Sequence, residues 1–301
     1  MEPCKHEFTI KAFDIRYNNQ NAIRRPEAHG HHRTLAQLRV ELDLDIVCGP
    51  ASHYSIMTAA RRIGYACISM LGFRRRKAST MLMTLSGPSR PPVAGGPPRR
   101  LVILLHGLGA DGNDLIGLQQ YWGRLVPDAE FLSPNAPFPC DGAPWGYQWF
   151  SVQDRSLPAI RAGVCAAAPV LDAFIDEELA KRELGNGDVA LVGFSQGTMM
   201  ALYVGLRRAA ALAGIVGYSG RLMGEDRLAG ELRSRPPILL VHGTADPVVP
   251  FASLAHAEAA LNGAGVPVET LVCRGVEHAI SPEGLQRGGA FLQQVFSAPR
   301  G

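Results

Sequence analysis

The sequence predicts an α/β domain with a mostly parallel central sheet and helices on both faces. Short runs of consecutive apolar residues recur from residue 101 onward, and such runs are typical of strands buried on both faces of a sheet. Between these runs lie segments whose apolar residues recur at helical spacing. Strands that alternate with helices favour a parallel sheet, in which binding sites lie at the carboxyl ends of the strands.

Five buried strands are predicted from the apolar runs. The first, LVILL, contains no polar residue and is followed directly by a glycine-rich segment. The other four are also short, as strands in globular proteins usually are. The predicted strands cover residues 101–105, 189–192, 213–218, 238–241 and 268–272.

Three helices are predicted from apolar spacing and from end signals. The longest follows the apolar repeat over residues 160–179, and the Gly-Asn-Gly sequence at 185–187 ends it. The second covers residues 251–261 and ends at an Asn-Gly pair. The last begins with Ser281 as its N-cap and a proline at its first helical position, and it runs to about residue 296.

Charge and composition divide the chain near residue 86. The net charge is +3, but residues 1–85 carry 13 Lys+Arg against 7 Asp+Glu, whereas residues 86–301 carry 17 against 20. Eight of the 13 residues at 86–98 are Gly or Pro, which predicts a linker. We therefore expect an N-terminal extension over 1–85, either disordered or an over-extended gene start, then the linker, then the α/β domain over 99–298.

Several classes of protein are excluded by composition. The basic excess is confined to the extension, so no nucleic-acid partner is predicted. The chain has no run of 18 apolar residues, which predicts no stable membrane insertion. The six cysteines form no C-x-x-C pair, so a reducing, cytoplasmic location fits best. The cluster His29, His31 and His32 has the residue type of a metal site, but we interpret these histidines as surface residues.

A candidate nucleophile follows the strand at 189–192. Gly193-Phe194-Ser195-Gln196-Gly197 matches the G-x-S-x-G pattern, and a helix-compatible run follows it. In this strand–turn–helix context the serine is held in a strained turn that exposes its hydroxyl, and the two glycines allow neighbouring chain to pack closely. The alternative is a structural serine in an ordinary turn. We predict that Ser195 is the nucleophile.

An acid and a base follow two later strands in the order that this pattern requires. Asp246 comes just after the strand at 238–241, and His278 comes after the strand at 268–272. Glu277 is the alternative acid, but adjacent side chains rarely meet in the needed orientation. Three other histidines are alternative bases but are expected to have structural roles: His106 and His242 to bind loop backbone, and His256 to lie on a helix surface.

The glycine-rich segment after the first strand is a candidate oxyanion site. His106-Gly107-Leu108-Gly109 and the residues after it allow the backbone to turn inward, and a tetrahedral intermediate needs two preorganised N–H donors. We predict the backbone amides of Leu108 and Gln196 as these donors. A phosphate-binding turn is the alternative, but the segment lacks the lysine of a P-loop and the spacing of a dinucleotide fold.

Four motifs together resemble one family. HGLGADGNDL, GFSQG, HGTADPVVP and GVEHAIS, in this order over residues 99–298, are similar to the phospholipase/carboxylesterase family of α/β-hydrolases, which includes bacterial carboxylesterases and acyl-protein thioesterases. The resemblance implies the α/β-hydrolase fold, a triad of Ser195, Asp246 and His278, and oxyanion amides at Leu108 and Gln196.

The resemblance also covers the segment that ends in WGYQWF at residues 145–150. In the family a similar stretch lies beside the acyl site, so Trp149 and Phe150 are predicted to bind substrate; core packing is the alternative. Ser151 stands where the family pattern has an acidic residue directly after Trp-Phe.

The activity implied is that of a serine carboxylesterase acting on small to medium acyl esters through an acyl-enzyme, with no metal or organic cofactor. An acyl-protein or acyl thioesterase, or a lysophospholipase, is the alternative within enzymes. A non-catalytic binding module with a hydrolase fold is the alternative outside them. The expected partner is a small-molecule ester, and the oligomeric state is left open, a homodimer included.

Overall fold

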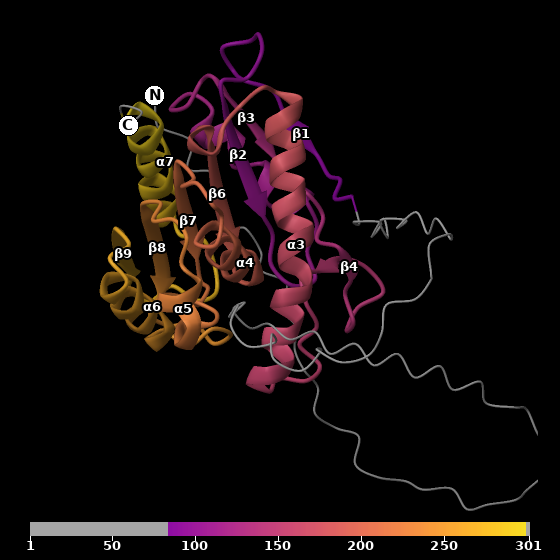
Figure 1. Ribbon diagram of the computed structural model, residues 1–301, viewed down its shortest axis with the longest axis vertical. Helices are drawn as coiled ribbons and strands as arrows, with labels where there is room; N and C mark the ends of the chain where they lie inside the picture. The colour runs from indigo at the N-terminus through magenta and orange to yellow at the C-terminus, as the bar shows by residue number, and fades with distance from the viewer. Residues whose placement is uncertain (1–83, 299–301) are drawn as a thin grey trace, which may run out of the picture. The chain divides into compact units, whose positions relative to one another are not determined.

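A mostly parallel sheet forms the centre of the computed structural model, which describes residues 84–298 (Figure 1). Its seven strands lie in the order β1-β3-β2-β6-β7-β8-β9, and only β1 runs antiparallel to its neighbour. The strands are β1 (Ser89–Arg90), β2 (Arg100–Leu105), β3 (Ala129–Leu132), β6 (Val189–Phe194), β7 (Gly214–Tyr218), β8 (Ile238–Gly243) and β9 (Val268–Cys273). The predicted fold class and the five predicted strands are confirmed, each to within two residues at either end, and four of them are buried. The prediction that β9 is buried is wrong, because β9 is the edge strand at the end of the sheet and only its Cys273 is buried.

Helices cover both faces of the sheet. α3 (Leu157–Lys181), α4 (Gln196–Gly205) and α6 (Ala252–Gly263) pack on one face, and α1 (Asn113–Ile116), α2 (Gln119–Trp122) and α7 (Pro282–Ser297) on the other. A short helix, α5 (Leu228–Glu231), follows β7, and a small hairpin of β4 (Phe138–Pro139) and β5 (Tyr147–Gln148) stands apart from the sheet. The predicted cap of the last helix is confirmed, because the Ser281 hydroxyl accepts a hydrogen bond from the Gly284 amide at 3.0 Å.

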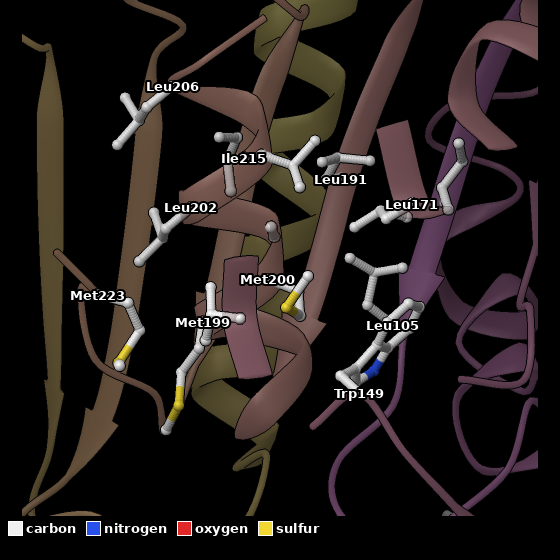
Figure 2. Close-up of a cluster of buried hydrophobic side chains, with 14 of the residues drawn as sticks. Leu105, Trp149, Leu171, Leu191, Met199, Met200, Leu202, Leu206, Ile215 and Met223 are labelled. Carbon is white, nitrogen blue, oxygen red and sulfur yellow. The ribbon is translucent and has the colours of Figure 1, made fainter. Parts of the chain in front are cut away.

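Two separate cores result from the alternation of side chains along the strands. In β2, Leu101, Ile103 and Leu105 belong to the core under α3, α4 and α6, whereas Val102 and Leu104 belong to the core under α1, α2 and α7. Figure 2 shows part of the first core, where side chains from the strands lie with those of α3 and α4. Burial on both faces explains why these strands are continuous apolar runs.

The order of the strands places a switch point beside β2. The chain passes from β2 to β3 on one side and then crosses to β6 on the other side of β2. In open α/β sheets, ligands bind where the strand order reverses in this way, outside the carboxyl ends of the strands. The loops after β2 and β6 are therefore expected to line the site.

The segment predicted as a linker is part of the fold. Within residues 86–98, β1 pairs with β3, so that Ser89 lies opposite Leu132, and Leu85 just before it is buried in the first core. The linker prediction needs correction here, because a proline-rich segment can still supply a short edge strand. The predicted extension, with its histidine cluster, lies outside the described residues except for residues 84 and 85.

The long helix α3 is amphipathic. Its buried residues include Ile160, Val164, Ala167 and Leu171, at the spacing that the sequence predicted. Among the described helices it is the one that is long and apolar enough to cross a membrane by length and composition, with a mean hydropathy of 1.4. A core helix of this length gives the same signal, and α3 packs with one face on the sheet.

Candidate active site

The turn between β6 and α4 holds Ser195 in a strained backbone conformation. Its φ of 54° and ψ of −115° lie in a region that non-glycine residues rarely adopt. The turn is enforced from both sides: a β-carbon added at Gly193 would overlap the Thr198 amide, and one added at Gly197 would overlap the Leu105 carbonyl oxygen. Both glycines are therefore required for the close packing of the turn on β2 and α4.

The loops after β8 and β9 interlock and bring Asp246 to His278. The Ala245 amide donates to the Val276 carbonyl oxygen at 3.0 Å, and a β-carbon at Gly243 would overlap that same oxygen. As a result, Nδ1 of His278 lies 2.8 Å from Oδ2 of Asp246, although 32 residues separate them. The alternative acid, Glu277, does not take this position.

The environment of Asp246 favours its ionised form. Its side chain is fully buried, which by itself opposes ionisation. Hydrogen bonds from His242, from His278 and from the amides of Val249 and Val248 outweigh that effect, and they hold the pKa of Asp246 well below its ordinary value. An ionised carboxylate only accepts hydrogen bonds, so Nδ1 of His278 carries the hydrogen and Nε2 is free to act as a base.

The His278 ring packs beside the serine turn. Its centroid lies 4.8 Å from that of Phe194, the residue that directly precedes Ser195. The imidazole thus contacts both the carboxylate of Asp246 and, through Phe194, the turn that carries the serine. Nucleophilic catalysis by a serine requires a base that is oriented by a third group and lies near the nucleophile.

Two backbone amides in the loops around the serine have no acceptor within the described part of the chain. A β-carbon on Gly107 would lie only 3.4 Å from that of Ser195, so the loop after β2 runs directly beside the turn. In that loop the Gly109 amide donates to the Tyr147 carbonyl oxygen, but within residues 84–298 the amides of Leu108 and Gln196 have no hydrogen-bond acceptor. These are the two amides that the sequence predicted as oxyanion donors, and the second belongs to the first turn of α4.

The side chain of Gln196 connects the serine turn to the segment after β5. Its Oε1 accepts from the Trp149 amide at 3.1 Å, and its Nε2 donates to the Phe150 carbonyl oxygen at 2.8 Å. Nε1 of the Trp149 indole in turn donates to the His106 carbonyl oxygen at 3.0 Å. Sequence reasoning assigned only the backbone of Gln196, because residues nearly 50 positions apart leave no local pattern.

Trp149 and Phe150 lie in the core. Both are almost completely buried and belong to the core under α3, α4 and α6. Figure 2 shows Trp149 in this core. Their burial favours the core-packing interpretation, while direct contact with substrate stays a prediction. Ser151, next in sequence, is exposed.

The other histidines take the places that the sequence predicted. Nδ1 of His106 lies 2.7 Å from the Gly107 carbonyl oxygen, Nε2 of His242 lies 3.0 Å from that of Val249, and His256 is exposed on α6. Burial lowers the pKa of His106, against the opposing effect of its backbone hydrogen bond. Within the described part of the chain, no group of three or more His, Cys, Asp or Glu side chains is arranged to hold a metal ion.

Comparison with known proteins gives one consistent answer. Residues 93–296 match the family model described as Phospholipase/Carboxylesterase. The chain is 30% identical to esterase YpfH of Escherichia coli over 190 residues, which are 63% of this chain and 80% of that protein. It is 32% identical to acyl-protein thioesterase 1 of Schizosaccharomyces pombe, over 66% of this chain and 92% of that protein.

A solved structure is similar over the same region. The crystal structure of esterase PE8 matches with a TM-score of 0.68 and 43% sequence identity, covering 70% of this chain and 99% of that one.

Proposed function

The chain belongs to the phospholipase/carboxylesterase family, and we propose that it hydrolyses carboxylic esters through an acyl-enzyme on Ser195. The observation that carries this proposal is the 2.8 Å hydrogen bond between His278 and Asp246, at the edge of the sheet that also bears the strained serine turn. Relatives named as esterases and thioesterases support the reaction class.

In the first step, Oγ of Ser195 attacks the carbonyl carbon of the ester. Nε2 of His278 accepts the serine proton as the new C–O bond forms. Asp246, ionised and bound to Nδ1, keeps the ring in the tautomer whose Nε2 is a base, and it stabilises the imidazolium that results. The pKa of Asp246, which its hydrogen bonds hold low, keeps it in that role.

The carbonyl oxygen of the ester becomes an oxyanion in this step. The amides of Leu108 and Gln196, which have no acceptor within the described residues, are proposed as its donors. Because these amides are fixed by the loop after β2 and by the first turn of α4, no reorganisation is needed when the charge develops. The positive end of the α4 dipole adds to the stabilisation.

The leaving alcohol and the acyl group depart in sequence. When the tetrahedral intermediate collapses, the C–O bond to the alcohol breaks and His278 returns its proton to the alkoxide. A water molecule then gives a proton to His278 and attacks the acyl-enzyme. Collapse of the second intermediate releases the acid and restores the hydroxyl of Ser195.

A thioester is the second candidate substrate. The acyl-protein thioesterase relatives favour it, and the S. pombe protein aligns over 92% of its length. Esters and thioesters place the same carbonyl oxygen on the same two amides, so the described site accommodates both chemistries. Hydrolysis rates on nitrophenyl esters and on acyl thioesters, each over a series of acyl lengths, would rank the two classes.

The proposal is tested with the variant Ser195→Ala. We expect turnover of a short nitrophenyl ester to fall by about 10⁶ and labelling by a fluorophosphonate probe to disappear. Ser297→Ala, which changes an exposed serine at the end of α7, serves as the matched control and should keep both. If Ser195→Ala keeps most of the esterase activity, the proposal is wrong. If the wild-type chain neither turns over esters nor is labelled, the binding-module alternative replaces it.

A further inference from the structure

We propose that His242 is a positioning residue, which holds Asp246 in the orientation that His278 needs. The inference rests on the proposed function, because it concerns the acid of that triad. His242 lies near the end of β8, and its side chain is 1% exposed, compared with 12% for His278. A side chain so deeply buried acts on the reaction only through its neighbours.

The hydrogen-bond geometry of His242 determines its role. Nε2 lies 3.0 Å from the Val249 carbonyl oxygen and 3.3 Å from Oδ2 of Asp246. A carbonyl oxygen and an ionised carboxylate can only accept hydrogen bonds, so Nε2 must carry the hydrogen, which it donates to the Val249 oxygen while facing Oδ2 of Asp246. The ring is held edge-on to Phe251, with centroids 6.1 Å apart and planes at 73°.

His242 completes a set of donors around the carboxylate of Asp246. Oδ1 accepts from the amides of Val248 and Val249, at 2.8 and 2.9 Å. Oδ2 accepts from His278 at 2.8 Å, and Nε2 of His242 lies 3.3 Å from the same oxygen. The two histidines approach the same oxygen, so His242 fixes the rotation of the carboxylate that determines where Nδ1 of His278 can bind.

The same imidazole also anchors the loop that carries Asp246. The bond to the Val249 carbonyl oxygen ties residues 246–249 back to β8, from which the loop departs. Without this donor a buried carbonyl oxygen loses its partner, and the carboxylate keeps only one donor on Oδ2. Outer partners that orient functional side chains in this way typically contribute a factor of about 10 to 100.

The experiment compares three substitutions of one buried ring. His242→Leu removes the donor but keeps an apolar side chain of similar size. His242→Gln places an amide nitrogen near the position of Nε2, whereas His242→Asn, the matched control, carries the same amide on a shorter chain. We expect kcat for a nitrophenyl ester to fall about 10- to 100-fold in His242→Leu and His242→Asn, with KM nearly unchanged. His242→Gln should recover most of the loss.

A double variant separates positioning from general structural support. In an Asp246→Ala background, His242→Leu should cause little further loss of kcat, because the group that it orients is already absent. Additive losses, or a kcat within twofold of wild type in folded His242→Leu, would overturn the inference.

A measurement on the wild-type protein does not depend on whether the variants fold. Nitrogen-15 NMR of the imidazole rings should find Nε2 of His242 protonated, as its position 3.0 Å from the Val249 oxygen and 3.3 Å from Oδ2 of Asp246 requires. An unprotonated Nε2 would contradict the inference, since that atom could then not donate. The protonation of Nε2 is measured without reference to catalytic activity. Failure of the proposed function would be recognised separately, because Ser195→Ala would then keep full activity.

Discussion

The carboxyl and amino ends of the strands carry different kinds of residues. At the carboxyl end lie the strained residues Ser195 and Ser219, both with positive φ, and the buried polar side chains of His106, His242 and Asp246. The Ser219 hydroxyl there is buried without a hydrogen-bond partner among the described residues.

The amino end carries ion pairs that join helices to strands. Arg182, just after α3, binds Glu130 of β3 at 2.7 Å and Glu178 at 2.6 Å. Arg100, the first residue of β2, binds Asp188 at 2.6 Å. Among residues 84–298, the one positive φ of a non-glycine residue near this end is that of Glu183, in the turn that follows α3.

The contrast indicates that stability and chemistry are separated along the strands. Strain and desolvated polar groups are tolerated where they position reacting atoms, and the rest of the fold compensates for them. Substitutions of the polar side chains at the carboxyl end should therefore change activity more than stability, and substitutions that break the ion pairs at the amino end should do the reverse.

The largest expected effect on activity, after loss of the nucleophile, is that of Asp246→Asn at the carboxyl end. An asparagine can present an N–H to Nδ1 of His278 and so favour the wrong tautomer, which should lower kcat by about 10⁴. Steady-state kinetics and thermal unfolding check this prediction. A fall in kcat below tenfold would show that Asp246 is not the acid of the triad.

The next effect is steric and tests the serine turn. In Gly197→Ala the new β-carbon overlaps the Leu105 carbonyl oxygen, so we expect a destabilisation of about 3 kcal/mol or more together with loss of activity. The control is Gly187→Ala at the amino end, where a β-carbon meets nothing within 4 Å. Denaturant unfolding should separate the two variants, and equal stabilities would contradict the packing described for the turn.

A smaller effect is expected from Arg208→Gln at the amino end. This arginine, 6% exposed, binds Asp176 at 2.5 Å, Asp172 and the Asn186 side chain. Since the two aspartates are 48% and 65% exposed, losing the arginine should lower the free energy of unfolding by only about 1–2 kcal/mol.

The activity of Arg208→Gln tests whether a substitution at the amino end leaves catalysis unchanged. kcat/KM of Arg208→Gln, measured well below its unfolding temperature, should stay within twofold of wild type. Arg161→Gln, which breaks an exposed pair with Asp226, is the control and should change stability by less than about 0.5 kcal/mol. A large loss of activity in folded Arg208→Gln would show that residues at the amino end also support catalysis.

The smallest expected effect is a change in the free energy of unfolding at alkaline pH. Burial, followed by a hydrogen bond to Cys165, raises the pKa of Tyr203 to about 12, above its ordinary value of about 10. The folded state therefore favours the neutral phenol, and its stabilising contribution is complete below about pH 10 and is lost as the pH rises toward 12.

The variant Tyr203→Phe tests this dependence. Its free energy of unfolding should fall less steeply than that of wild type between about pH 10 and 12, in denaturant titrations at each pH. Identical slopes would show that folding does not raise the pKa of Tyr203.

Much of the fold could be predicted because it depends on local patterns. The strand at 101–105 is buried on both faces, so its apolar run is unbroken and easily recognised. β3 was missed, because Glu130 interrupts its short apolar run and only the ion pair with Arg182 makes that residue acceptable there. β1 was missed because a two-residue edge strand has no pattern of its own.

The candidate site shows the same division. Ser195, Asp246 and His278 were predicted because each follows an apolar strand, and the carboxyl ends of parallel strands meet at one edge. The partners of the Gln196 side chain and the contact of His242 with Asp246 escaped prediction, since they depend on how the loops interlock.

By itself, the sequence determined which residues form the five longest strands and which polar groups stand at their carboxyl ends. Periodicity and turn chemistry act over a few residues, so they can be read from the chain. Only the tertiary structure decided that Oδ2 of Asp246 is shared by two histidines, that Trp149 is a core residue, and that the proline-rich segment adds an edge strand. Those outcomes depend on contacts between segments far apart in the chain, whose geometry is set by packing and not by local pattern.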